Sequence, residues 1–160
     1  MMESSRIAEI LTDPVSVDLL EKSPLLSVAY TGIDGAPRVV PVSFLVRHQR
    51  FIFCTASTAP KVAALQRDPR VALTVDVAWP PCCLLVRGVA EVDIVEGVPT
   101  EFLDAALRNI PTDMHEDFTA QVRGLYDSMA RIVVTPSWTR LIDFQRTAPQ
   151  AVERLAAAKE

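Results

Sequence analysis

The chain has 160 residues, of which 49% are apolar and 22% are charged. This composition is typical of a single folded domain rather than a disordered segment. A formal net charge of −4 argues against broad attraction to nucleic acid or to an anionic membrane, and no apolar stretch is long enough to cross a bilayer.

The chain begins with helical spacing in residues 7–20, which includes a helix start signal at Asp13-Pro14. A series of β-strand signals follows. Turn residues at 33–35 predict a hairpin between the first two strands, and a polar turn at 47–50 places the third strand beside the second, as in a meander. The predicted strands cover residues 25–32, 37–47, 51–55, 71–77, 82–96, 130–136 and 137–144.

Three further segments predict helices. Residues 57–68 have helical spacing, with Ser57 or Thr58 as the N-cap, Pro60 in the first turn and an end near Asp68-Pro69. Residues 99–127 contain two apolar stripes separated by Pro111, which indicate two helices. The tail at 149–159 predicts a short terminal helix.

The predicted strands indicate a closed or nearly closed barrel, because closure removes the unpaired edges of many short strands. In residues 82–96 apolar side chains from Leu84 to Val92 alternate with charged ones, so one face is predicted to be core and the other solvent. Pro136 separates the last two strands. We expect one mainly β domain over residues 1–160, with a core at 20–145 and a helical insertion at about 98–127.

Residues 57–61 have the chemistry of an anion site. Hydroxyl side chains precede Lys61 in the first turn of a helix, where free N–H groups and the helix dipole favour negative charge. The alternative is that Thr58 only caps the helix and Lys61 is a solvated surface residue. Motifs for nucleotide triphosphates, dinucleotides and hydrolase nucleophiles are absent, and the acidic run at 113–117 lacks the spacing of a metal site.

The start of the chain lacks the pattern of a signal peptide, and three cysteines without metal or disulfide spacing indicate a reducing cytoplasm. His48 and His115 are both expected to be solvated, and no catalytic residue is assigned. We expect a small-molecule partner and no metal.

Three stretches resemble the pyridoxamine 5'-phosphate oxidase-like family of FMN-binding split barrels. They are residues 34–42, residues 51–75 and the strand Val86-Arg87-Gly88-Val89-Ala90-Glu91-Val92. The second is the most specific, since a strand, a hydroxyl-rich turn, a lysine helix, Asp68-Pro69-Arg70 and a returning strand follow in the family's order. The resemblance covers roughly residues 20–145 and implies a split β-barrel of six to seven antiparallel strands with a few helices.

The resemblance implies a flavin site shared across a homodimer interface, in which Lys61 holds the phosphate. It also makes Trp79 and Trp138 candidates for packing on the flavin or on the partner subunit, although a tryptophan is more often simply packed. The cofactor-binding residues that it implies are Arg38, Val39, Pro41, Val42, Ser43, Cys54, Thr55, Ser57, Pro60 and Lys61.

The function implied is that of an FMN-dependent oxidoreductase in which the cofactor transfers hydride or electrons. FMN is expected over FAD, because the turn offers one phosphate site and the chain has no glycine-rich pyrophosphate loop. A deazaflavin-dependent reductase and a non-enzymatic flavin- or haem-binding protein are the alternatives. Vitamin B6 oxidation is not expected, because the chain ends in Arg-Leu-Ala-Ala-Ala-Lys-Glu rather than in the basic segment of the true oxidases.

Overall fold

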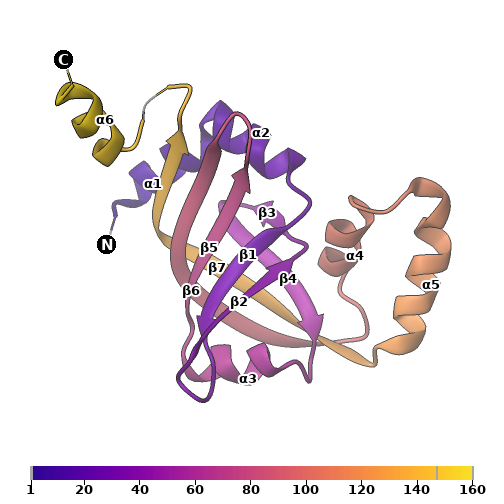
Figure 1. Cartoon of the computed structure of the whole chain (residues 1–160). Helices are drawn as coiled ribbons and strands as arrows, with labels where there is room; N and C mark the ends of the chain where they lie inside the picture. Colours follow the sequence, from indigo (N-terminus) through magenta and orange to yellow (C-terminus); the bar gives the residue numbers. More distant parts are fainter. Residues whose placement is uncertain (1, 147, 160) are drawn as a thin grey trace.

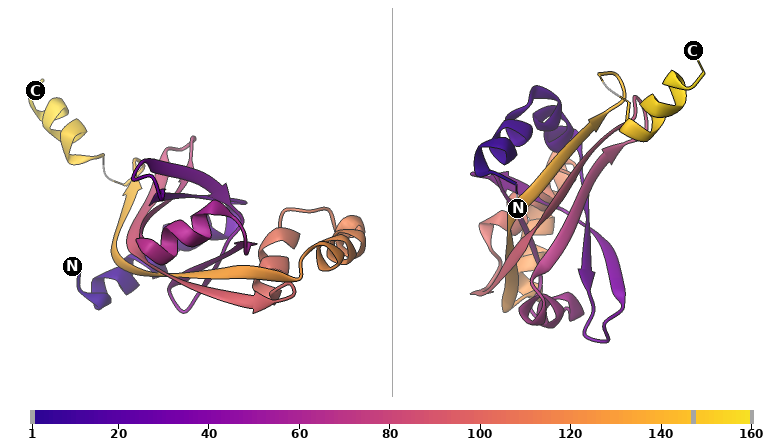
Figure 2. Two further views of the ribbon diagram at one scale, coloured as in Figure 1. Left: turned by 90° about the horizontal axis from the view of Figure 1, so that it is seen from below. Right: turned by 90° about the vertical axis from the view of Figure 1, so that its left-hand side faces the viewer.

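The computed structural model describes residues 2–146 and 148–159. Within them, seven strands form one antiparallel sheet in the order β2-β1-β5-β6-β7-β4-β3. The sheet curls around its own core but does not close, since β2 and β3 remain unpaired edges (Figures 1 and 2). The split-barrel expectation is therefore confirmed, and full closure is not. The strands are β1 (Leu26–Thr31), β2 (Pro37–Val42), β3 (Leu45–Arg47), β4 (Arg50–Ala56), β5 (Arg70–Val77), β6 (Cys82–Glu96) and β7 (Ser128–Asp143).

The meander predicted for the first strands is wrong in one respect, because both of its turns form but residues 37–47 are not a single strand. Residues 37–47 form two strands, and Phe44 lies between them with its side chain 1% exposed in the core. β2 pairs with β1 at one edge of the sheet, whereas β3 pairs with β4 at the other. His48 and Gln49 form the β3–β4 turn with φ of 50° and 62°, which suits the two central positions of a tight hairpin. Burying Phe44 thus moves the chain from one edge of the sheet to the other.

β6 and β7 form one continuous ladder from Cys82↔Asp143 to Glu96↔Ser128. The predicted break at Pro136 is instead a bulge, because Arg87 pairs with Trp138 and Gly88 with Pro136, which leaves Ser137 as the extra residue. Glycine is needed here, since a Cβ on Gly88 would lie 2.5 Å from the backbone oxygen of Thr135. The bulge lets a strand that contains proline continue through the sheet.

Helices cover the two ends of the curled sheet and one side (Figure 1). The first helical segment divides at Asp13, whose carboxylate accepts from the Val15 N–H at 2.9 Å and so caps the second helix. The α4–α5 segment occupies the predicted insertion, and the C-terminal helix stands beyond the end of the sheet. The helices are α1 (Ser4–Thr12), α2 (Pro14–Lys22), α3 (Pro60–Arg67), α4 (Thr100–Leu107), the 3₁₀ turn η1 (Thr112–Met114), α5 (His115–Leu125) and α6 (Gln150–Ala157).

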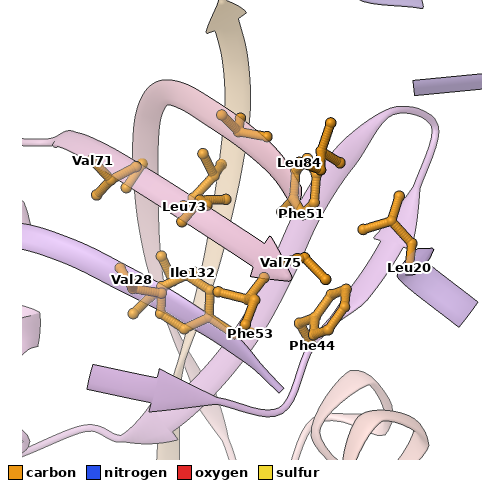
Figure 3. Close-up of a cluster of buried hydrophobic side chains, with 14 of the residues drawn as sticks. Leu20, Val28, Phe44, Phe51, Phe53, Val71, Leu73, Val75, Leu84 and Ile132 are labelled. Carbon is orange, nitrogen blue, oxygen red and sulfur yellow. The ribbon is translucent and has the colours of Figure 1, made fainter. Parts of the chain in front are cut away.

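The hydrophobic core lies inside the curl of the sheet (Figure 3). Val28 of β1, Phe53 of β4 and Ile132 of β7 are all buried there, although they come from strands far apart in the sequence. On β6 the predicted alternation is confirmed, with Leu84, Val86 and Ala90 inside. No helix among the described residues is both long and apolar enough to cross a membrane.

Candidate functional site

A small cleft lies where the ends of β2 and β4 meet the first turn of α3. Its volume is about 230 Å³. Eight residues line it: six of the ten that are predicted to contact the cofactor, and two from α4. We call this hollow the α3 cleft; its lining residues are Pro41, Val42, Ser43, Cys54, Thr55, Lys61, Phe102 and Ala105.

Lys61 is the basic residue among those that line the α3 cleft. Its Nζ donates to Thr55 Oγ1 at 3.3 Å, and burial lowers the pKa of the Lys61 ammonium. The predicted capping by Ser57 or Thr58 is wrong, because Ala59 is the N-cap and no side chain caps α3. A half-buried cation therefore lies next to an uncapped helix start, an arrangement that favours an anion.

Cys54 lies in the same lining as a neutral thiol. Burial raises its pKa to about 12; the carboxylate of Glu101 acts in the same direction, and Arg131 opposes both. A thiol of this kind is a poor nucleophile at neutral pH. Cys54 is thus suited to packing against a ligand rather than to reacting with one.

Two of the predicted residues, Arg38 and Pro60, line a neighbouring hollow of about 370 Å³. This hollow lies between the β1–β2 turn and α3. Arg38 Nη2 contacts Asp34 Oδ2 at 2.6 Å, and this hydrogen bond holds the pKa of the Asp34 carboxyl below its usual value. The charge of Arg38 is therefore balanced within its own hairpin.

The remaining two predicted residues line neither hollow. Val39 is 67% exposed on the edge strand β2. Ser57 Oγ lies 2.9 Å from Ser128 Oγ and so ties the end of β4 to the start of β7. Within one chain, Ser57 therefore joins two strands, whereas the side chain of Val39 is exposed to solvent.

Helix α4 forms one wall of the α3 cleft with residues that the sequence did not predict to bind the cofactor. Phe102 of α4 faces the α3 cleft and packs against Phe118 and Tyr126, with ring centroids 6.4 Å away in both cases. Beside it, Glu101 accepts from Arg131 at 3.2 Å, and Arg131 also contacts Asp93 at 2.7 Å. The apolar stripe beginning at Phe102 was the available signal, but it did not show which side of the helix faces the cleft.

The tryptophans and histidines lie outside the α3 cleft. Trp79 is 83% exposed, and Trp138 packs under the guanidinium of Arg87 at 4.5 Å. His115 is half-buried rather than solvated, with Nε2 2.8 Å from the Ile110 carbonyl oxygen. Among residues 2–146 and 148–159, no three metal-ligating side chains gather at one point.

A family profile described as pyridoxamine 5'-phosphate oxidase matches residues 12–138, which is most of the chain. The chain belongs to the pyridoxamine 5'-phosphate oxidase family. The matched range contains every strand up to the middle of β7 and all the residues of the α3 cleft. No curated protein sequence matches the chain.

Several solved structures resemble this chain. An F420 reductase is 26% identical, with a TM-score of 0.56 over 77% of this chain and 94% of that one. A conserved hypothetical protein from Mycobacterium tuberculosis is 19% identical, with a TM-score of 0.62 over 89% and 86%. The haem storage protein HutZ from Vibrio cholerae is 17% identical, with a TM-score of 0.56 over 80% and 92%. The last two likenesses concern the fold alone.

Proposed function

We propose that the protein binds FMN in the α3 cleft, at the interface of a homodimer, and acts as a flavin-dependent oxidoreductase. The observation that carries this proposal is the position of Lys61, which lies next to the uncapped start of α3 in a cleft lined by two strand ends. Family membership supports a flavin as the cofactor, and the position of Lys61 supports the cleft as the place for its phosphate.

The charge around α3 favours a ligand with one phosphate. Lys61 provides one cation in the α3 cleft, whereas Arg38 is paired with Asp34 and Arg70 with Asp68. FMN carries a single terminal phosphate, which suits one lysine and one helix start. FAD would bring a pyrophosphate and an adenosine, for which these residues offer no second cationic site.

When bound, FMN would supply the hydride or electron transfer. The protein's own residues would bind and orient it: Lys61 at the phosphate, the hydroxyls of Ser43 and Thr55 as hydrogen-bonding groups, and Phe102 as an apolar wall. Among the described residues that line the cleft, none is a carboxylate or a histidine that could act as a general acid or base. We therefore propose that protons reach the reacting molecule from solvent or from the second subunit.

The size of the α3 cleft supports a shared site. Its volume of about 230 Å³ is below the range of about 300–1,000 Å³ usual for small-molecule sites. Next to it, Val39 exposes an apolar side chain on the unpaired edge of the sheet. A second copy packed along β2 would cover Val39 and enclose the cofactor.

A deazaflavin is the second candidate, because an F420 reductase is 26% identical over 77% of the chain. Haem is less well supported. Among the described residues lining the α3 cleft there is no histidine, methionine or tyrosine, and the Cys54 thiol is held neutral by burial. Those four side chains are the usual axial ligands of haem iron.

The test is a titration of apo-protein with FMN, riboflavin, FAD and coenzyme F420, together with the solution mass by light scattering. We expect FMN to bind most tightly, and the mass to be twice the chain's 17.6 kDa. Tighter binding of FAD would refute the single-phosphate argument, and tighter binding of F420 would establish the second candidate. A monomer of full FMN occupancy would refute the shared site.

A further inference from the structure

The C-terminal helix α6 has an apolar face with no partner in its own chain. Val152 and Leu155 are 44% and 65% exposed, and no residue of the helix is buried. Figures 1 and 2 show α6 beyond the end of the sheet, away from the rest of the molecule. At eight residues, α6 is shorter than the roughly 12–15 residues that a helix needs to persist alone in water. The helix therefore requires a surface to pack against.

A groove at the same end of the sheet offers such a surface. It lies between α2 and the β5–β6 turn and has a volume of about 600 Å³. We call it the α2 groove. Val77 and Trp79 line it and are 42% and 83% exposed. Large apolar side chains exposed side by side are typical of a surface that binds a partner. Leu19 and Cys82 form part of its floor.

The charges of the helix and the groove are complementary. Asp76 is the carboxylate of the α2 groove that is exposed and has no ion pair among the described residues. The other two carboxylates of the groove are already paired, Asp18 with Lys22 at 2.6 Å and the buried Asp143 with Arg146 at 3.5 Å. Lys159 follows Val152 by seven residues and Leu155 by four, so it continues their face at the end of the helical turn. A helix laid in the groove through its apolar face would bring this ammonium towards Asp76.

The connection to α6 favours the groove of another copy over the helix's own. Arg146 is held by Asp13 at 2.8 Å, and three residues separate it from Gln150, where α6 begins. The last of the three, Pro149, has an extended backbone with φ −56° and ψ 142°. Short connections favour exchange of an arm between copies over folding back.

We propose that α6 of each chain docks in the α2 groove of a second copy, so that two chains exchange their C-terminal helices. Two chains related by a two-fold axis that exchange their helices fill both grooves, so the exchange closes at a dimer. It uses a surface separate from the α3 cleft, within the same two chains, and does not depend on a cofactor.

Cys82 makes the proposal testable, because it is a native thiol in the α2 groove. In a Leu155→Cys variant, a short bismaleimide reagent should join residue 155 to Cys82 of the other copy. The expected product is a covalent dimer on a denaturing gel, at twice 17.6 kDa. The reaction should be run at mildly alkaline pH, because burial raises the pKa of the Cys82 thiol and the reagent reacts with the thiolate.

Two controls identify the contact. A Leu155→Cys, Cys82→Ser double variant should lose the covalent dimer. A Glu153→Cys variant, which places the thiol on the opposite face of α6, should form it at least about tenfold more slowly at equal protein concentration. An intramolecular cross-link would show docking within one chain and overturn the proposal, as would equal dimer formation by the two cysteine positions or no cross-link at all.

An independent measurement uses the dimer affinity. Leu155→Asp should raise the dimer dissociation constant on the order of ten- to a hundredfold in sedimentation experiments, because a buried leucine is replaced by a charge. An unchanged dissociation constant would overturn the proposal. Both experiments run without flavin, so their failure leaves the proposed cofactor site to be judged by its own titration.

Discussion

Replacing Lys61 by alanine tests the proposed phosphate site directly. Lys61 lines the α3 cleft beside the start of α3, and its side chain has one weak hydrogen bond, at 3.3 Å to Thr55 Oγ1. Removing it should weaken FMN binding and leave the fold intact. Alanine is a good helix residue, and loss of a cation near a helix N-terminus is not unfavourable, so stability should change by no more than about 0.5 kcal/mol.

The size of the effect follows from the burial of the ammonium. A fully exposed ion pair contributes only about 0–1 kcal/mol, whereas a charge-assisted hydrogen bond in a partly dry site contributes about 1.5–3 kcal/mol. Lys61 belongs to the second class, because burial already lowers its pKa. We therefore expect FMN affinity to fall about ten- to a hundredfold.

Two ligands and one matched variant make the assay specific. Calorimetric titration with FMN should separate Lys61→Ala from the wild type, and titration with riboflavin, which lacks the phosphate, should not. Arg6→Ala is the control, because it removes a cation from α1, and among the described residues none from this helix lines the α3 cleft or the α2 groove. It should bind FMN like the wild type.

The pH dependence gives a second readout. Burial lowers the pKa of Lys61 in the empty cleft, and a bound phosphate should raise it again. The contribution of the Lys61 ammonium to FMN affinity is therefore present while the lysine is protonated in the empty cleft, and it is lost as pH rises through the higher pKa of the bound state. Wild-type FMN affinity should thus decline on the alkaline side while Lys61→Ala shows no such decline. Equal FMN affinities for two folded proteins would return Lys61 to the role of a solvated surface residue.

Three further outcomes are expected. Gly88→Ala should lower the free energy of unfolding by about 1–3 kcal/mol and Tm by about 3–10 °C in a thermal melt, because its Cβ would meet the Thr135 carbonyl oxygen. Gly124→Ala, in open space on α5, should raise Tm slightly instead. Equal shifts of Tm in the two variants would refute the close approach at Gly88. Cys54, with a pKa near 12, should be alkylated far more slowly in the folded than in the unfolded protein when followed by mass spectrometry, and equal rates would contradict its burial. Phe102→Ala should weaken FMN and riboflavin binding alike, by about two- to tenfold, whereas a loss confined to FMN would place Phe102 at the phosphate.

The sequence predicted those parts of the fold in which local pattern and burial agree. In residues 82–96 the positions from Leu84 to Val92 on one face are all apolar or glycine, and β6 has the predicted inner face because that side of the strand meets the core. Residues 37–47 offered no such contrast. Nearly all of them are apolar or β-branched, so the pattern did not show that Phe44 turns into the core and ends one strand before the next begins. Pro136 gave a strong local signal for a strand break, but β7 continues through it. The bulge opposite Gly88 accommodates its missing N–H.

The candidate site was predictable where its residues follow one another along the chain. Thr55 and Lys61 are separated by one turn, and they meet in the α3 cleft as expected. Side-chain contacts that the residue order does not specify were not predictable. Arg38 pairs with Asp34 only four residues away, within the β1–β2 hairpin, and Phe102 reaches the cleft because α4 packs against the distant strand β4. Whether the side chains on the list bind FMN stays a prediction.

The ends of the α4–α5 segment lie next to each other at the last rung of the β6–β7 ladder. Glu96 pairs with Ser128, and the Gly97 N–H donates to the Asp127 carbonyl oxygen at 2.7 Å. Evolution can therefore change the length of the chain beyond α4 without disturbing the ladder, because the segment leaves and returns at one point of the sheet while α4 itself is packed against β4. A scaffold built this way can acquire new substrate preferences through one loop exchange while the strands beneath it are inherited unchanged.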